Sequence, residues 1–332
     1  MKATRIAIVG YGNVGRGVYK ALERNPDMSL AGIISRDPNR VRNEFGNTIV
    51  PITSPDNLRV INADVAILCG GSKDDLPKQG PFFVEHYNTV DSFDTHAKIP
   101  EYFHKIDEFA RKNGKTSIIS AGWDPGTFSV NRVLMDAFLP GTIPKAFYGL
   151  GETGGLSMGH SDAVRQVKGV KDARQYTHAI PEAIERVRDG ENPDLSVGEM
   201  HWRECYVVAE SDDPGEMERI SDEIISMPNY FKPYKTKVHF VTQEILDKQL
   251  SGMPHDGLVL AVGETGNGNK AMIEYRNEWE SNPEATGNVL IACARACKRF
   301  NNEGKNGAYT MLDIPTSYLS PHSNEKLLKD FM

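Results

Sequence analysis

Three short motifs in the first 125 residues carry residue types that bind charged ligands. The first is GYGNVG at residues 10–15, which has the pattern glycine-x-glycine-x-x-glycine. The other two place an aspartate just beyond an apolar run, Asp94 in VDSFD and Asp124 in SAGWDPG. Glycines let a backbone approach a phosphate closely, and carboxylates attract a cation. The three motifs together indicate a site that takes a phosphorylated ligand and a positively charged one.

The glycine motif lies between an apolar, β-branched run, Ile6–Val9, and a helical stretch, Gly15–Glu23. In that context the first glycine allows a tight turn and the second lets the backbone approach a pyrophosphate. The third lets helix and strand pack closely, with the pyrophosphate at the helix N-terminus. The alternative is a glycine-rich turn that binds nothing. The position between strand and helix favours a dinucleotide site.

The end of the next strand discriminates between the two nicotinamide dinucleotides. NAD-dependent enzymes usually have an acidic residue there that binds the ribose 2′-hydroxyl, whereas this chain has Ser35 and Arg36. A hydroxyl and a guanidinium suit a 2′-phosphate, and Arg40 would add a second positive charge. Asp37 would repel the phosphate unless its carboxylate points away. The sequence therefore predicts NADP(H).

Two further segments are expected near the nicotinamide. Residues 69–72, CGGS, follow the strand at 65–71 and would pass under the nicotinamide ribose, although an ordinary turn is the alternative. Asp94 and Asp124 fall at the strand ends where the nicotinamide should lie, and two carboxylates there could hold a substrate ammonium. Alternatively, Asp94 caps a helix and Asp124 belongs to an Asp-Pro-Gly turn. The residues alone leave both interpretations open.

The surrounding pattern indicates an α/β fold with a Rossmann-like, doubly wound parallel sheet, because short apolar runs alternate with helical ones. After about residue 126 the runs at 201–208, 236–241, 257–264 and 271–275 alternate apolar and polar residues, as half-exposed antiparallel strands do. Helices near 181–189, 215–226 and 286–300 would cover one face of that sheet. We therefore expect a dinucleotide-binding domain at 1–125 and an α+β substrate-binding and dimerisation domain at 126–299, with about 300–332 packing back on the first.

The composition narrows the class of protein. The net charge of −7 over 332 residues argues against nucleic acid and an anionic membrane surface as partners. No apolar run approaches the ~20 residues that span a bilayer, and the first residues lack a signal-peptide cleavage site. None of the four cysteines lies in a C-x-x-C pair, and no His/Cys cluster has zinc spacing, so no metal is predicted. A reducing, cytoplasmic setting fits.

The chain closely resembles the meso-diaminopimelate dehydrogenase family. The resemblance rests on VGYGNVGRG, the serine-arginine of ISRD, LCGGS, TVDSFDTH, ISAGWDPGTFSVNR, LSMGHSDAVR, GVKDARQYT, RECYVV, MPNYF, SGMPH, ESNP and TMLDIPTSYLSP, in consistent order from residue 9 to 321. It implies reversible NADP⁺-dependent oxidative deamination of the D-centre of meso-2,6-diaminopimelate to L-2-amino-6-oxopimelate and ammonia. It also implies a homodimer and a place in bacterial lysine and cell-wall precursor metabolism.

The resemblance also implies site residues. Cofactor contacts are expected at Gly10, Tyr11, Gly12, Asn13, Val14, Gly15, Ser35, Arg36, Cys69, Gly70, Gly71, Ser72, Ser92, Phe93, Asp94, Ala121, Gly122, Trp123, Asp124 and Pro125. Substrate contacts are expected at Asp94, Asp124, Tyr148, Met158, Gly159, Thr177, Arg203, His255 and Asn269, with Asp94 and Asp124 catalytic.

The chemistry of a zwitterionic substrate agrees with this assignment. Arg203 lies in an alternating strand, from which a guanidinium can bind a carboxylate bidentately, although a strand arginine is commonly only a solvated surface residue. Thr177 and His255 can donate at the same end, and His255 is expected in a loop. Asp94 and Asp124 would orient the amine and stabilise the iminium charge. An ordinary aspartate pKa of about 4 makes a poor base, so the general base stays open.

Two other classes of protein agree less well with the sequence. A semialdehyde dehydrogenase needs a reactive cysteine facing the nicotinamide, and no local signature activates Cys69, Cys205, Cys293 or Cys297. An NADP(H)-binding sensor would lack anchors in the second domain, against which Arg203 and His255 argue. The amino-acid dehydrogenase is the favoured hypothesis.

Arg36→Glu tests the interpretation of the second strand. Removing the guanidinium and adding a negative charge should cut the preference for NADP⁺ over NAD⁺ by roughly tenfold or more, about 1.4 kcal/mol. The measurement is the ratio of kcat/KM for the two coenzymes. An unchanged ratio would contradict the NADP(H) prediction.

Overall fold

The structure is a computed structural model that describes residues 3–46, 61–228 and 230–332. The chain divides into two compact units. The first unit comprises Met1–Val130 and Pro283–Met332, and the second comprises Asn131–Asn282. The predicted boundaries at 125/126 and 299/300 therefore differ from the boundaries of the compact units. The largest difference concerns residues 283–299, which belong to the first unit.

The first unit contains a six-stranded parallel sheet in the order β13-β5-β4-β3-β1-β2. The sequence order changes direction at β1 and β3, which is the switch point where ligands bind in such sheets. This confirms the predicted doubly wound architecture. The strands are β1 (Thr4–Val9), β2 (Met28–Ile34), β3 (Val65–Leu68), β4 (Asn88–Asp91), β5 (Thr116–Ile118) and β13 (Gly307–Tyr309).

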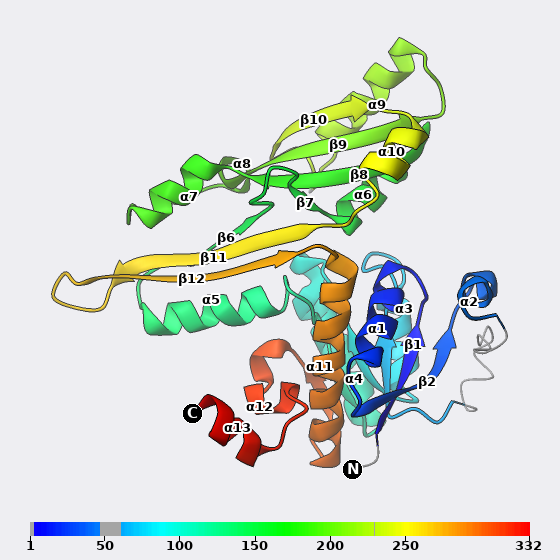
Figure 1. Ribbon diagram of the computed structural model, residues 1–332, viewed down its shortest axis with the longest axis vertical. Coiled ribbons are helices and arrows are strands. Elements are labelled where there is room, and N and C mark those ends of the chain that lie inside the picture. The colour runs from blue at the N-terminus through cyan, green and yellow to red at the C-terminus, as the bar shows by residue number, and fades with distance from the viewer. Residues whose placement is uncertain (1–2, 47–60, 229) are drawn as a thin grey trace. The chain divides into compact units, whose positions relative to one another are not determined.

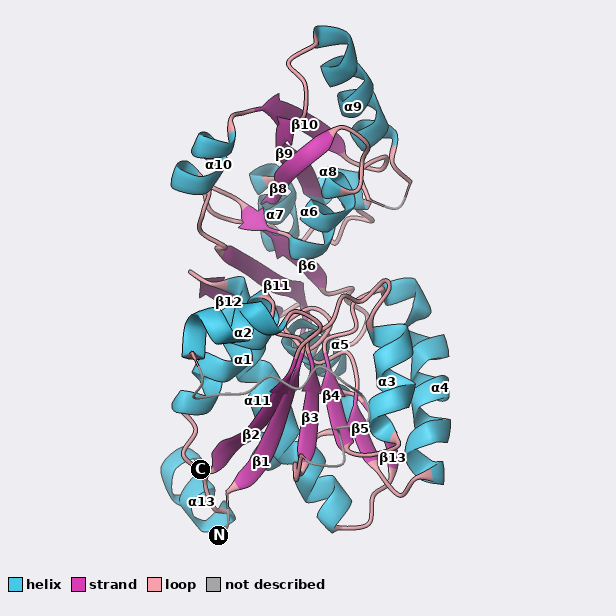
Figure 2. Ribbon diagram, turned by 90° about the vertical axis from the view of Figure 1, so that its right-hand side faces the viewer, coloured by secondary structure: helices cyan, strands magenta, loops and turns pink. Residues whose placement is uncertain are grey.

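Helices cover both faces of this sheet (Figure 2). One hydrophobic core lies between the sheet and α1 and α11, and another lies between the opposite face and α3 and α4. Both cores are buried because parallel strands are apolar on each face. The helices are α1 (Asn13–Glu23), α2 (Pro38–Phe45), α3 (Leu76–Val84), α4 (Ile99–Lys112), α11 (Asn282–Asn302), α12 (Thr316–Leu319) and α13 (Asn324–Phe331).

Helix α11 corrects one prediction. The helical stretch near 286–300 was expected to cover the sheet of the second domain. Instead Leu290, Ile291 and Cys293 are buried in the core of the first unit. A glycine contact brings α11 against α1, because a Cβ on Gly287 would overlap the backbone of Gly17. The periodicity showed that this helix has a buried face but not which sheet it covers.

The second unit contains two smaller sheets, of four strands in the order β10-β9-β8-β7 and of three in the order β12-β11-β6. All pairings are antiparallel except that of β10 with β9, which is parallel. The run at 236–241 was expected to be antiparallel, and that expectation is wrong for its pairing. The strands are β6 (Lys145–Tyr148), β7 (Gly155–Leu156), β8 (Val170–Ala179), β9 (His201–Ala209), β10 (Lys235–Phe240), β11 (His255–Glu264) and β12 (Lys270–Trp279).

Local sequence signals place the helices of this unit. For α9, Pro214 occupies the first turn and the Asp213 side chain accepts the N–H of Glu216 at 2.9 Å, which caps the helix. Ile220 and Ile224, four residues apart, then lie buried against the four-stranded sheet. The helices are α5 (Thr127–Phe138), which begins in the first unit, α6 (Met158–Arg165), α7 (Pro181–Arg188), α8 (Val197–Met200), α9 (Pro214–Ser226) and α10 (Gln243–Gln249).

A long hairpin of β11 and β12 projects along α5 (Figure 1). The strands pair from His255 with Trp279 at one end to Glu264 with Lys270 at the other. His255 is therefore the first residue of a strand, whereas it was expected in a loop. This matters because a strand fixes the direction of its ring.

Candidate functional site

The turn between β1 and α1 has the geometry of a dinucleotide cradle. Gly10 has φ +90° and donates its N–H to the carbonyl of Ile34 at 2.8 Å. A Cβ on Gly15 would overlap the Gly10 carbonyl oxygen, whereas a Cβ on Gly12 would meet no atom within 4 Å. The backbone at Gly12 is therefore open, at the N-terminus of the helix that begins at Asn13. This cradle fits a pyrophosphate group.

Tyr11 and Val14 support this turn from within. Tyr11 is 2% exposed, and its hydroxyl donates to Glu44 at 2.9 Å. Burial raises the pKa of the Tyr11 phenol far above its ordinary range. Val14 packs against the core of the first unit. Both side chains therefore face the protein, and their contribution to the cradle is through the backbone.

The end of β2 presents Arg36 outward. The Arg36 guanidinium pairs with the carboxylate of Asp75 at 2.9 Å and remains largely exposed. Ser35 is buried, and its hydroxyl donates to the carbonyl of Asp37 at 2.8 Å. The Asp37 carboxylate accepts the N–H of Asn39 and pairs with Arg40 at 3.3 Å. The Asp37 carboxylate, which could have repelled a 2′-phosphate, therefore caps α2.

Residues 69–72 follow β3 with little room for side chains. A Cβ on Gly70 would overlap the side chains of Gln79 and Asp75, and the Gly71 N–H donates to Asp75 at 3.0 Å. Burial raises the pKa of the Cys69 thiol well above its ordinary range, which opposes a thiolate nucleophile. Burial likewise raises the pKa of Cys205 and Cys293 to about 12. The covalent dehydrogenase alternative loses its chemical basis.

Asp94 lies beyond β4 and is held by Ser72. The Ser72 hydroxyl accepts the backbone N–H of Asp94 at 2.8 Å and that of Thr95 at 3.2 Å. The side chain of Asp94 is exposed. Partial desolvation nevertheless raises the pKa of Asp94, while Ser72 and His96 act to lower it. The preceding residues differ, since Phe93 is buried and stacks on Tyr102 at 4.2 Å, and Ser92 is half-buried.

Asp124 lies beyond β5 on the same edge of the sheet. Ala121 donates its N–H to the carbonyl of Asp91 at 2.8 Å, and Trp123 packs edge-on against Phe128 at 5.0 Å. Asp124 itself is half-buried and joined to Pro125 by a cis peptide bond. Gly122 accepts the N–H of Thr127. Both predicted catalytic aspartates therefore follow adjacent strands, β4 and β5.

In the second unit, Arg203 and Thr177 are cross-strand neighbours on β9 and β8. Both are buried, at 7% and 2% exposure, and the Arg203 guanidinium donates to the Thr177 hydroxyl. The guanidinium also lies over the ring of Tyr234, 4.1 Å from its centroid. Burial lowers the pKa of Arg203, and its Nε has no hydrogen-bond partner among the described residues. A buried arginine with an unused N–H donor can bind an anion.

Three histidines lie close enough to this cation to be affected by its charge. Burial, together with the smaller effect of the Arg203 charge, lowers the pKa of His160 and of His201 to about 3, and that of His255 to about 4. All three rings are therefore neutral at pH 7. The His255 ring lies against Gly155, where a Cβ would overlap it, and Gly155 pairs with Thr177. Sequence analysis named His255 and missed His160 and His201, whose side-chain neighbours only the fold supplies.

Tyr148, Met158 and Gly159 lie near the same cluster. Tyr148 ends β6, donates its N–H to Nε2 of His201 at 3.0 Å and stacks on that ring at 5.2 Å. Met158 and Gly159 begin α6, directly after the cap residue Ser157, which bonds the ring of His160 at 2.8 Å. Gly159 is exposed, and a Cβ there would meet no atom within 4 Å. The structure thus gathers these three residues around the histidines.

Asn269 does not belong to this cluster, and its grouping with the other residues is wrong. It lies in the turn of the β11–β12 hairpin, whereas His255 lies at the opposite end of β11. Nine residues of extended strand separate the two ends, which is about 30 Å. A better candidate is Asn282, which is buried and donates from its side chain to the carbonyl of Leu156 at 3.3 Å. The signal for it was the ESNP motif.

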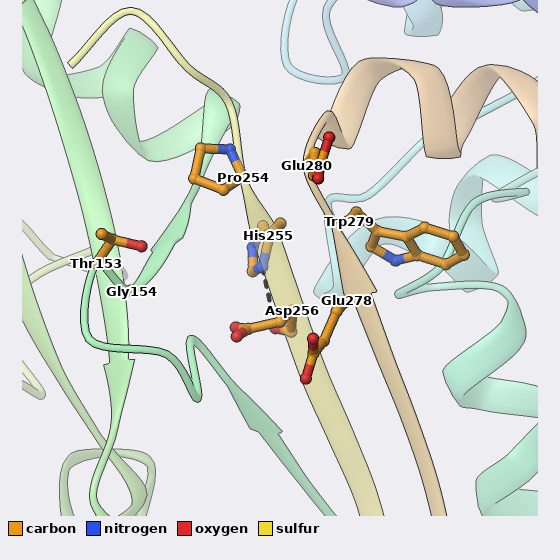
Figure 3. A pocket seen from close by; sticks show the side chains of 8 residues that line it. All are labelled: Thr153, Gly154, Pro254, His255, Asp256, Glu278, Trp279 and Glu280. Atoms are coloured by element: carbon orange, nitrogen blue, oxygen red, sulfur yellow. Dashed lines mark hydrogen bonds between the residues drawn. The ribbon is translucent and has the colours of Figure 1, made fainter. Parts of the chain in front are cut away.

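A cavity of about 340 Å³ opens beside His255 (Figure 3). The Asp256 and Glu278 side chains point to one side of the hairpin, and the Trp279 ring is directed away from them. Asp256 accepts the N–H groups of Leu150 and Gly151 at 2.7 and 2.9 Å, which fixes the loop before β7. The lining residues are Thr153, Gly154, Pro254, His255, Asp256, Glu278, Trp279 and Glu280.

The described residues contain neither a metal-binding cluster nor a membrane-spanning helix. Among residues 3–46, 61–228 and 230–332, no group of three or more histidine, cysteine, aspartate or glutamate side chains has a metal-binding arrangement. Within the same ranges, every helix is too short or too polar to cross a membrane.

Comparison with known proteins extends over the whole chain. Residues 122–281 match the model of the diaminopimelic acid dehydrogenase C-terminal domain. The chain is 48% identical to the meso-diaminopimelate D-dehydrogenase of Lysinibacillus sphaericus, with 100% of each chain covered. The structure of C. glutamicum DAP dehydrogenase in complex with DAP matches with a TM-score of 0.92, 39% identity and 100% of each chain covered. An engineered D-amino acid dehydrogenase bound to NADP⁺ matches with a TM-score of 0.89, 37% identity and 100% of each chain covered.

The dinucleotide cradle, the doubly wound sheet and these relatives define the chain as an NADP-dependent oxidoreductase that acts on an amino acid. More particularly, it belongs to the meso-diaminopimelate D-dehydrogenase family. The expected family, fold class and cofactor are thereby confirmed.

Arg203→Ala tests the anion site of the second unit. Loss of a charge-assisted contact should raise KM for the diamino acid by roughly 10- to 100-fold, because hydrogen bonds to charged groups are worth ~1.5–3 kcal/mol. Affinity for NADP⁺ should not change, because the cradle lies in the first unit. Arg174→Ala is the matched control, since Arg174 lies on β8 but pairs with Asp172. If KM for Arg203→Ala equals that of the control, Arg203 is not in the site.

Proposed function

We propose that this chain catalyses the reversible, NADP-dependent oxidative deamination of the D-centre of meso-2,6-diaminopimelate, which yields L-2-amino-6-oxopimelate and ammonia. The observation that carries the proposal is the buried pair of Arg203 and Thr177, because it is an anion site in a protein whose first unit is built for a dinucleotide. The full-length similarity to meso-diaminopimelate D-dehydrogenases supports this substrate.

Thr177 and Arg203 would contribute different hydrogen-bond donors to the anion site. The Thr177 oxygen accepts from Arg203, so its own proton is available to donate to a carboxylate. Arg203 offers its remaining N–H groups and a full positive charge in a poorly hydrated setting, where a charge-assisted bond is strong. The cation over the Tyr234 ring is held in place by that contact. The site therefore favours a carboxylate over a neutral group.

His255 adds the complementary polarity. Its Nδ1 lies 3.2 Å from the carbonyl of Asp256, an acceptor, so Nδ1 carries the proton of the neutral ring. Nε2 is then an acceptor, although the residue type alone had suggested a donor. An acceptor beside Arg203 suits the ammonium at the L-centre of a diamino acid, while the guanidinium takes its carboxylate. His201 is locked differently, since its Nε2 accepts from Tyr148.

Two carboxylates of the first unit are proposed to bind the amine at the D-centre. Asp94 and Asp124 follow adjacent strands and would bind the ammonium at the D-centre and stabilise the positive charge that develops as the C–H bond breaks. The raised pKa of Asp94 brings its carboxylate closer to the basicity that accepting a proton requires. When bound, NADP⁺ supplies the hydride acceptor at its nicotinamide ring. The residues proposed to hold it are those of the cradle, Ser35 and Arg36, and the strand ends at 69–72, 92–94 and 121–125.

We further propose that the chain forms a homodimer through α5. Leu134 and Phe138, four residues apart on this helix, are 43% and 65% exposed, and Val133 and Ile143 beside them are 51% and 60% exposed. Exposed large apolar side chains grouped in one segment of the chain are typical of a protein–protein contact. The face pairs with its own copy, as closed dimers do. A cytoplasmic enzyme of lysine and cell-wall precursor metabolism agrees with this assignment.

The reaction itself gives the direct test. Mixing the protein with NADP⁺ and meso-2,6-diaminopimelate at alkaline pH should increase absorbance at the reduced-nicotinamide band, because proton release favours oxidation there. The LL-isomer, which has no D-centre, is the matched substrate control and should give no increase. Absence of reduction with the meso-isomer would refute the proposed function, and equal rates with both isomers would refute D-centre specificity.

Phe138→Asp tests the dimer. A charge in the apolar face must be buried on association, which costs several kcal/mol, so the variant should be monomeric at concentrations where the wild type is dimeric. Light scattering coupled to size exclusion distinguishes the 36.8 kDa chain from twice that mass. Phe331→Asp, on the exposed face of α13, is the control and should stay dimeric. A dimeric Phe138→Asp variant would place the contact elsewhere.

A further inference from the structure

One buried carboxylate joins the ends of β4 and β5. Asp91, the last residue of β4, is 1% exposed. Its Oδ1 accepts the backbone N–H of Phe93 at 3.0 Å and that of Ser120 at 3.1 Å. Its Oδ2 accepts the hydroxyl of Tyr102, on α4, at 2.8 Å. A single side chain therefore holds two loops and a helix of the first unit together.

The backbone of Asp91 strengthens this link. Its carbonyl accepts the N–H of Ala121 at 2.8 Å, so two successive residues after β5 bond to Asp91. The first of them, Ser120, adopts φ +54°, a left-handed conformation that costs a serine on the order of 1 kcal/mol or more. The bond from the Ser120 N–H to Asp91 holds the chain in this conformation, which redirects it toward Asp124.

Both loops lead directly to the proposed amine-binding carboxylates. Asp94 follows Phe93 in the chain, and Asp124 lies four residues beyond Ser120. Ser72, beyond β3, accepts the N–H of Asp94 at 2.8 Å. The ends of the neighbouring strands β3, β4 and β5 are therefore linked by side-chain oxygens that accept backbone N–H groups. Asp91 lies at the end of β4, the middle strand of the three.

Burying this carboxylate is unfavourable for stability. Burial raises the pKa of Asp91 to about 6, against the lowering effect of its three donors. A buried charge commonly costs stability relative to an apolar residue of similar volume, so its presence calls for another explanation. The shape of the network provides one, because an apolar residue could not accept the N–H groups of two separate loops.

We propose that Asp91 is a positioning residue that sets the separation of Asp94 and Asp124 by holding both of their loops on one carboxylate. The inference rests on the proposed role of those two aspartates in binding the amine. Asp91 is buried, so it acts through the loops and not by contact with the substrate. Catalysis is sensitive to such positioning, since a displacement of about 1 Å can cost on the order of 100-fold in rate.

Asp91→Asn is the first test. The amide keeps the size of the side chain, but its NH₂ group cannot accept the Tyr102 hydroxyl. We expect kcat for the diamino acid to fall by about tenfold or more and its KM to rise. KM for NADP⁺ should rise less than KM for the diamino acid, because the loops at 92–94 and 121–125 also touch the cofactor but the pyrophosphate cradle at residues 10–15 is held by other contacts. This split would not follow from a general loss of stability.

Two tyrosine variants separate positioning from stability. Tyr102→Phe removes one of the three donors to Asp91 and should lower kcat/KM by about threefold to tenfold. Tyr87→Phe is the matched control. Tyr87 immediately precedes β4, at the end of the strand opposite Asp91, and its buried hydroxyl donates to the carbonyl of Ile61 at 3.1 Å. It should lose comparable thermal stability and keep its kcat/KM.

The outcomes distinguish the inference from the proposed function. A folded Asp91→Asn variant with wild-type kcat/KM, or equal effects of the two tyrosine variants on kcat/KM, would overturn the role of Asp91. If Asp91→Asn does not fold, the tyrosine pair decides alone. Wild-type protein that does not reduce NADP⁺ would instead refute the proposed function, and the inference with it.

Discussion

The first unit depends on close backbone contacts that only glycine permits. Gly15 lies against the carbonyl of Gly10, which seats α1 on β1, and Gly287 lies against Gly17, which seats α11 on α1. A Cβ at any of these contacts would separate a helix from its neighbour in a densely packed core. The same packing leaves the backbone at Gly12 open at the N-terminus of α1. The contact that holds the sheet and its helices together therefore also creates the dinucleotide cradle.

The second unit has a different constraint, the burial of positive charge. Arg203 lies near three histidines that burial, aided by its charge, keeps neutral, and among the described residues the Thr177 hydroxyl and the face of Tyr234 contact its guanidinium. Such a cation is poorly hydrated in the absence of a ligand, and a carboxylate would relieve this cost. The first unit thus carries carboxylates at its strand ends, whereas the second buries a cation.

Much of the first unit followed from local patterns. A glycine motif between a strand and a helix is a short-range signal, and the run of small or polar residues after β3, β4 and β5 marks one edge of a parallel sheet. Long-range pairing was harder. The partner of α11, the parallel pairing of β10 and the strand position of His255 all depend on contacts far apart in the chain, to which periodicity is blind. Asn269 was expected from the family resemblance, and the hairpin register separates it from His255.

The sequence by itself determined the chemistry: the glycines, Arg36, the two aspartates and Arg203 are the types that bind a phosphorylated dinucleotide and a diamino acid, and their motifs identify the family. Tertiary structure alone decided how those groups are held and charged. The capping role of Asp37, the neutral state of His255 and the network of Asp91 all arise from burial and from neighbours distant in the chain. Electrostatic state depends on surroundings, and surroundings exist only once the chain has folded.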